Sequence, residues 1–498
     1  MELVITVTIH KKLPNRNKKT GPVQISIIGG GFCGTMTAIN LMRNAQFPIR
    51  INIVNKGYPL AKGVAYAPHT SSLLLNVPNG RMSAYADMPD HYVQWLQERP
   101  RASELPVNEL RAGFSTREQY GLYLHDQWNE EKAKQNSALV ITYHDYALDI
   151  TEDGTLLKVH LQDNPALTSH YVILATGNAQ PALPSGIPSS LCNSKHYFAN
   201  PWKRDCVIAL SSTENVLIIG NGLTMADTVM GLTETGFTGQ IYTVSPHGYQ
   251  LKPAKEAKSP YPAPSYPDFI NSNTGFPELL GALNKHRKIA CHLNQSFYPA
   301  VDALRPYIPA LWQSFSNTDK KRFIKYVSHL WGSLRHRIPA QIHEFMTLMY
   351  ERKKLITYKG RITELKENTG QVNVTVNNNG DLQKLTVQRI INCAGPDTKL
   401  TANELLNNLQ KKGLICPDRW HLGIAANPEN GLVLNESGCK NNLFVIGANL
   451  KGTLWESTAV PELRVQAQKL AQHIIAEHIN DPIYGKDGDI YQQFGLNA

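Results

Sequence analysis

Two glycine-rich segments of the sequence have the spacing of dinucleotide-binding turns. The first is Ile27–Gly34, read Ile-Ile-Gly-Gly-Gly-Phe-Cys-Gly, and the second is Leu217–Ala226, read Leu-Ile-Ile-Gly-Asn-Gly-Leu-Thr-Met-Ala. Each follows an apolar, β-branched run and opens a segment with helical character. In such a turn the first glycine permits the sharp bend, the second lets backbone amides approach a pyrophosphate, and the third position packs the helix on the strand. Two turns predict two dinucleotides, usually a flavin and a nicotinamide, and therefore redox chemistry.

In the first turn, Gly29, Gly31 and Gly34 take these three roles. The free N–H groups and the positive dipole end of the following helix would face the phosphates. An acidic residue for the ribose hydroxyls is expected about 20 residues later. The sequence has Asn55 at that place, and an amide can hydrogen-bond a hydroxyl without offering charge.

In the second turn, Gly220 and Gly222 take the first two roles, and Ala226 is a small packing residue one position late. The alternative for either segment is a glycine-rich turn in an unrelated α/β fold. The pattern around the first turn favours the dinucleotide interpretation. It predicts a strand over Gln24–Ile28, a helix over Thr35–Asn44 and a strand over Ile49–Val54.

Length and composition indicate a soluble globular protein. The chain has 498 residues, of which 42% are apolar and 18% charged, and this length predicts about two to four domains. No stretch approaches the ~20 apolar residues of a membrane helix. Met1–His10 lacks the charged-then-apolar order of a signal peptide. We therefore expect a cytoplasmic protein with no membrane partner.

The net charge of +10 comes partly from two basic clusters. Lys11–Lys12 and Arg16–Lys19 predict a basic arm, and Arg335–Arg337 is a second cluster whose role the pattern leaves open. Basic clusters can bind nucleic acid or acidic substrates, but no aromatic-interleaved nucleic-acid module accompanies them. We expect solvated charge and attraction for dinucleotide phosphates, and no nucleic-acid partner.

The cysteines do not form a metal or redox motif. No two of them have Cys-x-x-Cys spacing, which argues against a zinc ribbon and against a disulfide centre of the thioredoxin-reductase type. We expect buried or incidental thiols and no metal site. The cysteines are Cys33, Cys192, Cys206, Cys291, Cys393, Cys416 and Cys439.

Hydrophobic periodicity predicts two α/β parts interrupted by helices. Ser115–Glu118 has the form of a capping box that opens a helix over Tyr120–Lys132. Arg389–Pro396 is interpreted as a strand that returns toward the first domain. Leu443–Gly447 predicts another strand, and Ser457–Ala476 predicts a final helix. The first domain is therefore expected to be discontinuous, with its last strand and helix near the C-terminus.

Several further motifs complete a family pattern. They are Gly63–Tyr66, Leu74–Ala84, Pro89–His91, Ala175–Gly177, Gly222–Asp227 and Trp455–Arg464. Together they resemble the two-dinucleotide flavoprotein superfamily, most closely a bacterial group of FAD/NAD(P)-binding proteins related to flavin-dependent N-hydroxylating monooxygenases. The resemblance covers roughly residues 22–475 and implies an α/β fold with two Rossmann-like domains and a helical insertion.

This resemblance implies FAD on the first turn and NAD(P)H on the second. It divides the chain into a basic arm (1–21), an FAD-binding domain in two parts (22–205 and 389–498) and an NAD(P)-binding domain (206–388) with an insertion at about 278–352. It places Asn76–Ser83 beside the flavin ring and the helix start at Ser457–Val460 at its pyrimidine edge, where a helix N-terminus stabilises reduced flavin. The predicted cofactor-binding residues are Gly29, Gly31, Gly34, Asn55, Asn76, Met82, Ser83, Gly177, Gly220, Gly222, Thr224, Ser245, His247, Gly447, Ser457 and Thr458.

The choice between NADPH and NADH is left open by one departure from the family pattern. Pro246 stands where related sequences usually have arginine, which would pair with the 2′-phosphate. Ser245, His247 and Lys252 could still serve that group. We expect a small preference for NADPH, with NADH possible.

Two residues are predicted to act in catalysis. Arg81 could bind a substrate carboxylate or a nicotinamide phosphate, and the alternative is a structural arginine. His196 could act as a functional histidine of the linker between the domains, and the alternative is a hydrogen-bonded interface residue. For Trp455, the alternatives are a core aromatic residue and a contact of the flavin ring.

The function implied is an FAD-dependent, NAD(P)H-consuming monooxygenase that uses molecular oxygen to hydroxylate the nitrogen of a small amino acid or amine. One alternative is a flavin-dependent NAD(P)H oxidoreductase with another acceptor. A second alternative is a non-enzymic dinucleotide-binding protein, because fold does not determine function.

Overall fold

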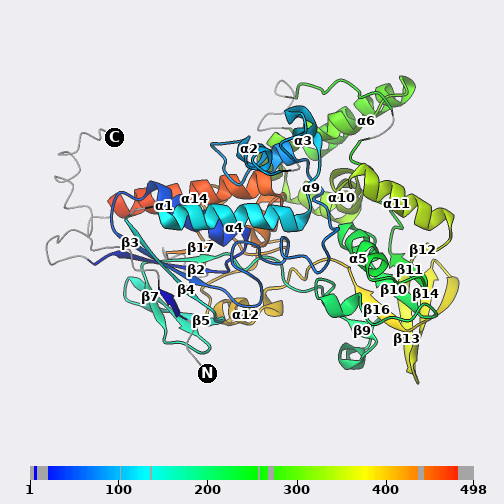
Figure 1. Ribbon diagram of the computed structural model, residues 1–498, viewed down its shortest axis with the longest axis horizontal. Helices are drawn as coiled ribbons and strands as arrows, with labels where there is room; N and C mark the ends of the chain where they lie inside the picture. The colour runs from blue at the N-terminus through cyan, green and yellow to red at the C-terminus, as the bar shows by residue number, and fades with distance from the viewer. Residues whose placement is uncertain are drawn as a thin grey trace.

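The computed structural model describes residues 21–100, 102–134, 137–184, 186–255, 258–266, 274–435 and 442–480, together with the backbone of Ile5–Val7. Figure 1 shows two α/β lobes side by side. The N-terminal and C-terminal parts of the described chain form one lobe, and the middle of the chain forms the other. The expectation of a discontinuous first domain is therefore confirmed.

The first lobe is built on a six-stranded sheet in the order β1-β4-β3-β2-β8-β17. All neighbouring strands are parallel except β1, which is antiparallel to β4. Because β1 lies within residues 1–21, the expected arm contributes an edge strand at that position. The strands are β1 Ile5–Val7, β2 Val23–Ile28, β3 Ile49–Val54, β4 Ala138–Tyr143, β8 Tyr171–Leu174 and β17 Leu443–Val445.

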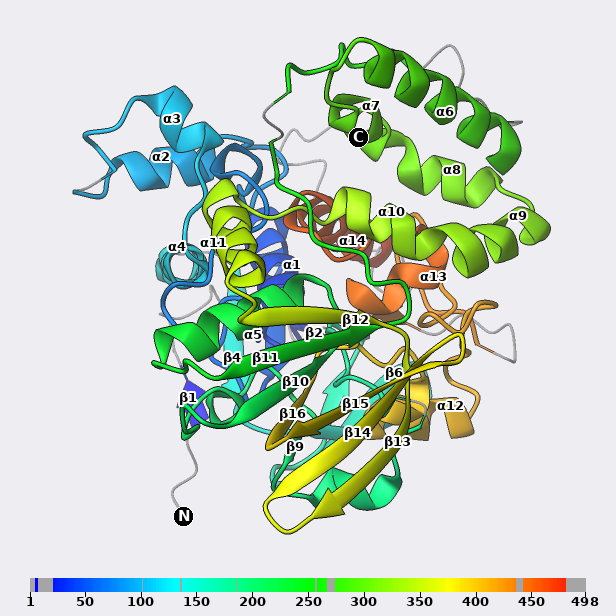
Figure 2. The same cartoon turned by 90° about the vertical axis from the view of Figure 1, so that its right-hand side faces the viewer.

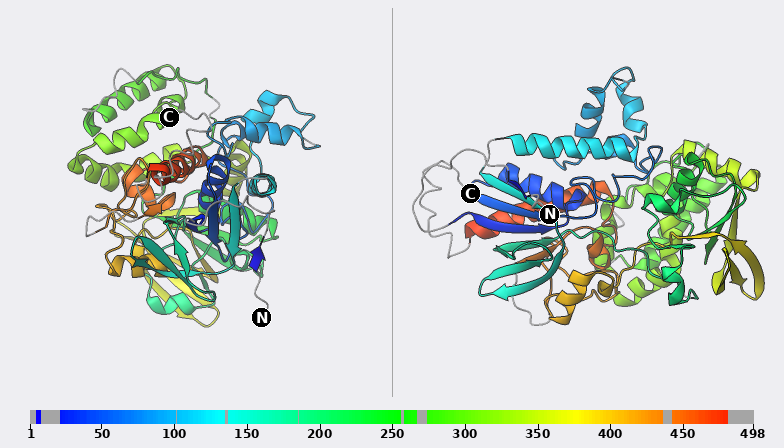
Figure 3. Two further views of the ribbon diagram at one scale, coloured as in Figure 1. Left: turned by 90° about the vertical axis from the view of Figure 1, so that its left-hand side faces the viewer. Right: turned by 60° about the horizontal axis from the view of Figure 1, so that its bottom comes forward.

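Helices cover one face of this sheet, and a small sheet covers the other (Figure 3). Ile173 of β8 belongs to the cluster with α1, α4 and α14, whereas its neighbours Val172 and Leu174 pack toward β5–β7 and α12. This alternation follows from the two-residue side-chain period of a strand. The covering elements are α1 Phe32–Asn44, α4 Arg117–Ala133, α14 Val460–Asn480, β5 Ala147–Asp153, β6 Leu156–Leu161, β7 Leu167–Ser169 and α12 Glu404–Lys411.

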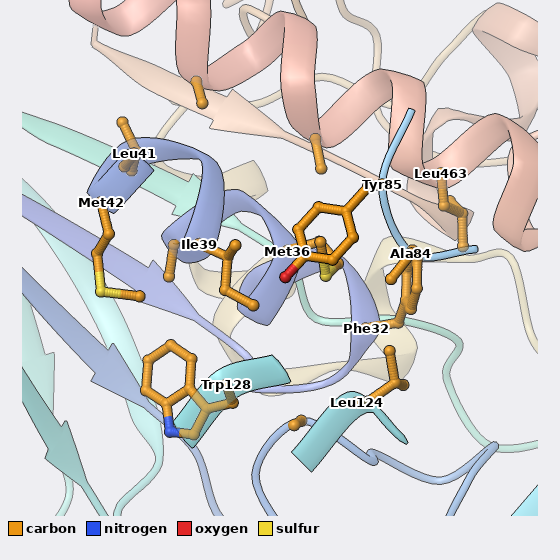
Figure 4. Close-up of a cluster of buried hydrophobic side chains, with 14 of the residues drawn as sticks. Phe32, Met36, Ile39, Leu41, Met42, Ala84, Tyr85, Leu124, Trp128 and Leu463 are labelled. Carbon is orange, nitrogen blue, oxygen red and sulfur yellow. The ribbon is translucent and has the colours of Figure 1, made fainter. Parts of the chain in front are cut away.

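The core beside α1 also includes part of the segment predicted to lie along the flavin. Figure 4 shows Ala84 and Tyr85 next to Leu463 of α14 and to Met36 of α1. All four side chains are buried. The segment is followed by α2 His91–Gln97 and α3 Val107–Ala112. Burial of Ala84 and Tyr85 thus fixes the segment that ends at Ser83 against the two helices that flank the first turn.

The second lobe repeats the parallel arrangement in the order β12-β11-β10-β16-β9. Its strands are β9 Tyr197–Phe198, β10 Asn215–Ile219, β11 Gln240–Ser245, β12 Leu355–Lys359 and β16 Arg389–Asn392. The expected return of Arg389–Pro396 to the first domain is wrong, because β16 pairs with β10 and β9. The predicted boundaries at 205 and 389 therefore shift, and the second sheet includes strands from Tyr197 to Asn392.

Two helices and a second small sheet pack on the strands of this lobe. They are α5 Leu223–Glu234, α11 Ala340–Glu351 and the antiparallel strands β13 Arg361–Asn368, β14 Gln371–Asn378 and β15 Asp381–Val387. The predicted helical insertion is confirmed, and Figure 2 shows most of its helices at the upper right. It consists of α6 Phe276–His292, α7 Tyr298–Asp302, α8 Ile308–Ser314, α9 Asn317–Arg322, a π-helical turn Phe323–Val327, α10 Ser328–Arg335 and α11 Ala340–Glu351.

The helix predicted over Tyr120–Lys132 is present, but its cap lies one residue later than expected. α4 starts at Arg117, and the Thr116 hydroxyl accepts a hydrogen bond from the Gln119 N–H at 3.1 Å. The N-cap is thus Thr116 rather than Ser115. Within the described ranges, no helix is long and apolar enough to cross a bilayer.

Polar contacts of α5 join the two lobes. Arg117 of α4 forms an ion pair with Asp227 of α5 at 2.8 Å, and the two side chains are only 12% and 14% exposed. At the last residue of α5, Glu234 accepts hydrogen bonds from Ser71 and Ser72 of the first lobe. Burial raises the pKa of Asp227, and Arg117 opposes that shift. The helix that follows the second glycine-rich turn is therefore fixed to the first domain at two points.

Arg117→Met should lower the free energy of unfolding by about 3 kcal/mol, because it leaves a buried carboxylate without its counter-charge. Adding Asp227→Asn should restore most of the loss, since the amide is neutral. Denaturant titration followed by tryptophan fluorescence measures both effects. Lys366→Met, which removes an exposed ion pair with Glu364, should leave stability unchanged within error. An equal loss in the single and double variants would contradict the charge explanation.

Candidate functional site

The first glycine-rich turn has the tight geometry that its sequence predicts. Gly29 follows β2 with φ of +109°, and a Cβ on it would lie 2.3 Å from the carbonyl oxygen of Ala175, next to β8. In α1, a Cβ on Gly34 would lie 1.9 Å from the Gly29 carbonyl oxygen. Both positions therefore require glycine for the strand, turn and helix to pack at all.

Gly31 is different, because the protein itself does not require glycine there. It is the N-cap of α1 with φ of −77°, and the nearest atom to a Cβ would be the Gly63 Cα at 3.7 Å. No capping side chain occupies this helix start. A bare N-cap with open space in front of it suits a pyrophosphate, which would take the free N–H groups.

The second turn repeats this division of roles. Gly220 has φ of +103°, and its Cβ would lie 2.3 Å from the carbonyl oxygen of Cys393, next to β16. Gly222 is the uncapped N-cap of α5 with φ of −95°, and a Cβ there would meet no described atom within 4 Å. Thr224 lies in the first turn of α5. Each lobe thus carries one such turn, called a cradle from here on: Gly29–Gly34 in the first lobe and Gly220–Thr224 in the second. In both cradles the first glycine lies against the backbone of a neighbouring strand.

Asn55 follows β3, and both ends of its amide are engaged. The oxygen accepts a hydrogen bond from the Gly30 N–H at 3.0 Å, and the nitrogen donates to the Tyr58 carbonyl at 2.9 Å. These bonds tie the first turn to the next strand. Binding of a ribose hydroxyl by Asn55 would use the remaining lone pair of its oxygen.

The segment predicted to line the flavin is joined to α14. Met82 and Ser83 are buried, the Ser83 hydroxyl donates to the Met88 carbonyl at 2.6 Å, and Arg464 of α14 donates to the Ser83 carbonyl at 2.9 Å. Asn76 lies at the lobe interface beside Arg117. The segment is therefore held between the start of α14 and the second lobe.

Two further predicted glycines lie where the first sheet ends. Gly447, after β17, has φ of +86°, and its Cβ would lie 2.9 Å from the Cys33 sulfur at the start of α1. Gly177, after β8, has φ of +69°, and the preceding Thr176 accepts a hydrogen bond from Asn449 at 2.9 Å. Gly29, Gly177 and Gly447 thus lie at the carboxyl ends of neighbouring strands, where ligands bind in this type of sheet.

A strained turn precedes α14 in the chain. Trp455 has φ of 61° and ψ of −61°, and the Glu456 N–H donates to the Leu454 carbonyl at 2.8 Å. This is a γ-turn of the strained kind, which persists only where surrounding contacts impose it. Trp455 packs 4.9 Å from Trp312 in the insertion, which supports the core-aromatic alternative.

Ser457, two residues after Trp455, is fully buried, and its hydroxyl has no hydrogen-bond partner. Buried hydroxyls in native proteins normally have a partner, because an unpaired one is destabilising. The neighbouring Thr458 is exposed. The unpaired Ser457 hydroxyl and the bare N-caps at Gly31 and Gly222 are the features that fit polar ligands.

Ion pairs from the insertion hold this turn on both sides. Arg335 forms two hydrogen bonds with Glu456, both 3.0 Å, and Arg305 forms two with Glu462, at 2.6 and 2.8 Å. Arg337 pairs with Asp302 at 2.6 Å. The basic cluster Arg335–Arg337 is therefore engaged inside the protein, which speaks against a nucleic-acid surface at these residues.

A cavity of 530 Å³ lies between the insertion and α14. Its volume is in the range of small-molecule sites. Its lining includes Arg81, Arg305, Gln313, Asn430 and Glu456. The sequence pattern did not indicate that Arg305 and Gln313 of the insertion would line one cavity with Asn430, because Asn430 lies far from them in the chain.

Arg81 is the one predicted catalytic residue at this cavity. Among the described residues, no hydrogen bond or ion pair reaches its guanidinium, whereas the neighbouring Arg305 is paired with Glu462. Desolvation, and then the charge of Arg305, lower the pKa of Arg81, which nevertheless remains a cation. A cation without a partner at a cavity is suited to an anionic ligand group.

His196 lies away from the other predicted residues. Its Nδ1 donates to the Gln388 carbonyl at 2.6 Å, and its own carbonyl accepts from the Ile390 N–H. These contacts are at the start of β16, whereas Gly220 lies at the end of the adjacent parallel strand β10. The geometry therefore matches a hydrogen-bonded structural histidine, whose partners lie within the second lobe rather than across a domain interface.

Comparisons with known proteins agree with this architecture. Residues 26–179 match a family model described as FAD-NAD(P)-binding. The ornithine N-hydroxylase of Kutzneria sp. 744, in a structure with reduced FAD, NADP⁺ and L-ornithine, has a TM-score of 0.63 at 13% identity and covers 92% of this chain and 100% of its own. The chain therefore shares the fold of this enzyme. No curated protein sequence matches it.

Other enzymes whose solved structures share this fold catalyse different reactions. The L-lysine 6-monooxygenase of Pseudomonas syringae has a TM-score of 0.61 at 15% identity, covering 90% of this chain and 98% of its own. The bacillithiol disulfide reductase of Staphylococcus aureus has a TM-score of 0.53 at 14% identity, covering 92% and 99%. The two-domain fold is thus shared by monooxygenases and disulfide reductases. Only the residues of the site can therefore indicate which type of reaction this chain catalyses.

Gly31→Val should give a folded protein without flavin, because its Cβ would make only an ordinary contact with the Gly63 Cα while the branched side chain fills the cradle. The measurement compares visible flavin absorbance with the thermal unfolding midpoint. Gly34→Ala is the contrasting variant and should destabilise the protein, since its Cβ collides with the Gly29 carbonyl. Full flavin content in a folded Gly31→Val protein would contradict the assignment of the first cradle.

Gly222→Val should keep the flavin but slow its reduction by NAD(P)H, while dithionite reduction stays normal. The reason is that the new side chain occupies only the second cradle. Anaerobic stopped-flow measurements of flavin absorbance report the rate. The variant is also the matched control for Gly31→Val, because each occupies the same place in its own turn. Unchanged reduction would require a different nicotinamide site.

Proposed function

We propose that this chain is an FAD-dependent, NAD(P)H-consuming monooxygenase that hydroxylates the nitrogen of a small amino acid or amine. The observation that carries the proposal is the pairing of two dinucleotide cradles with a cavity that contains an unpaired cation, Arg81. Support comes from the shared fold with ornithine and lysine N-hydroxylating enzymes. We also propose that the enzyme is cytoplasmic.

The two cradles fit the two cofactors in the same way. FAD would bind with its pyrophosphate at Gly29–Gly34, and NAD(P)H would bind at Gly220–Thr224. Bound FAD, reduced by NAD(P)H, would supply the activation of oxygen and its transfer to the substrate nitrogen. Asn76–Ser83 and Ser457 would lie along the flavin, and the unpaired Ser457 hydroxyl would then gain a polar partner.

The protein's own contribution is to orient the substrate and to exclude water. In this proposal Arg81 binds the carboxylate of an amino acid substrate through its planar guanidinium. The apolar and paired residues around it leave this carboxylate few other cationic partners, since Arg305 is engaged by Glu462. The substrate amine would then extend toward the flavin, and it must be neutral to act as a nucleophile.

A substrate screen tests the proposal. Purified FAD-loaded protein is incubated with NADPH and amino acids or diamines, and oxygen uptake, NADPH loss and hydroxylamine formation are followed together. The proposal requires hydroxylamine that depends on one amine. NADPH oxidation that instead follows a disulfide or quinone, without hydroxylamine, would establish the oxidoreductase alternative, which the fold shared with the disulfide reductase favours.

Arg81→Met should reduce kcat/KM for an amino acid by about 100-fold, or about 2.7 kcal/mol. It should hardly change kcat/KM for the corresponding diamine, which lacks the carboxylate. Arg81→Lys should lie between, because it keeps the charge but loses the planar fork. Flavin content and melting temperature serve as controls. Loss of flavin and stability together would show a structural arginine, and equal loss for both substrates would assign Arg81 to the cofactor.

A further inference from the structure

Two histidines from different parts of the chain meet beyond the end of β11. His247 lies in the loop after β11, and His329 is the second residue of α10 in the insertion. Their ring centroids are 4.8 Å apart, and His247 also stacks on Tyr249 at 5.3 Å. Figure 2 shows α10 above the ends of β11 and β12. The second domain and the insertion therefore build this pair together.

The pair lies where the adenosine ribose of a bound dinucleotide is expected. β11 follows α5 and runs parallel to β10, whose end leads into Gly220. In this fold, residues just after that strand contact the ribose and select either its 2′-hydroxyl or a 2′-phosphate. The Gly248 N–H donates to the Ser245 hydroxyl at 3.1 Å, which closes a tight turn around His247.

The charged groups that act on His329 are all positive. Desolvation, and then the charges of His247, Lys451 and Arg361, lower the pKa of His329. These groups come from the β11 loop, α13 Lys451–Leu454 and β13. Lys359, the last residue of β12, packs against the same loop. No carboxylate is among the groups that shift His329, so a bound anion would be the missing counter-charge.

The insertion changes its helical phase just before His329. The π-helical turn Phe323–Val327 contains more residues per turn than an α-helix, and such turns are frequent at functional sites. Phe323 packs 4.7 Å from Trp455 in the core, whereas His329, six positions later, contacts His247. One continuous segment thus anchors the insertion and presents an imidazole to the second domain.

We propose that His247 and His329 form a proton-linked subsite for the 2′-phosphate of NADPH, so that discrimination against NADH increases as the pH falls. The inference rests on the proposed use of a nicotinamide cofactor at the second cradle. The proposal gives His329 of the insertion a role in cofactor specificity. In it, the imidazoles of His247 and His329 take the place of the arginine that related sequences have at the position of Pro246.

The direction of the pH effect follows from the charges. In the free protein, the nearby cations disfavour protonation of His329. A phosphate beside the two rings, within reach of a nitrogen of each, favours their protonated forms, so binding takes up a proton and is strengthened at lower pH. Above the pKa of the complex this gain is lost. Because the phosphate itself takes a proton near pH 6, the useful window is about pH 6–8.

The test measures equilibrium binding of NADP⁺ and NAD⁺ to the FAD-loaded, oxidised protein at several pH values within the window of about pH 6–8. Binding is followed by calorimetry or by flavin absorbance. The two ligands differ only in the 2′-phosphate. The ratio of the NAD⁺ Kd to the NADP⁺ Kd should rise as pH falls, by up to about tenfold per pH unit for one linked proton. His329→Gln should flatten this dependence while leaving the Kd for NAD⁺ unchanged.

His292→Gln, on the exposed end of α6, is the matched control and should keep the native pH dependence. A ratio that does not change with pH in the native protein overturns the proposal. A dependence that persists in His329→Gln and disappears only in His247→Gln overturns the role of the insertion. If neither nucleotide binds, both the proposed subsite and the assignment of the second cradle are overturned. If both nucleotides bind with the expected pH dependence but no amine is hydroxylated, only the proposed reaction is overturned.

Discussion

The close contact between a glycine and the carbonyl of the neighbouring strand is the constraint on which both cradles depend. Gly29 lies against Ala175, and Gly220 lies against Cys393, with the same 2.3 Å limit for an added Cβ. Any side chain would push the turn away from the sheet. Because the turn stays close, α1 and α5 start directly above the strand ends, with their free N–H groups at Gly31 and Gly222 facing open space. The positions of both proposed dinucleotides follow from this contact.

The insertion determines what surrounds the cavity that it forms with α14. Its arginines pair with Glu456 and Glu462, and its aromatic residues pack on Trp455, so a strained turn is held in place from several sides. In these ion pairs, Glu462 and Glu456 neutralise the charges of Arg305 and Arg335. Arg81 remains as the cation without a partner, and its availability is therefore a consequence of how the insertion is docked.

The relation between the two lobes is set by a helix rather than by the sheets. α5 carries the second cradle at its start, the ion pair with Arg117 along its length and the Glu234 contacts at its end. A rotation of the second lobe would have to break the buried ion pair, which is unfavourable. The two cradles are therefore held in one arrangement, in which α10 of the insertion also reaches the β11 loop at His329.

The sequence by itself determined the two strand–turn–helix cradles, the helical insertion and the strand and helix near the C-terminus, because each of these elements is encoded by residue spacing within a short segment. Only the tertiary structure decided the pairing of β16 with β10, the engagement of Arg335–Arg337 by carboxylates, the distant place of His196 and the meeting of His247 with His329. These contacts join residues far apart in the chain, and no local periodicity records which strands pair or which charges meet when separate elements pack together.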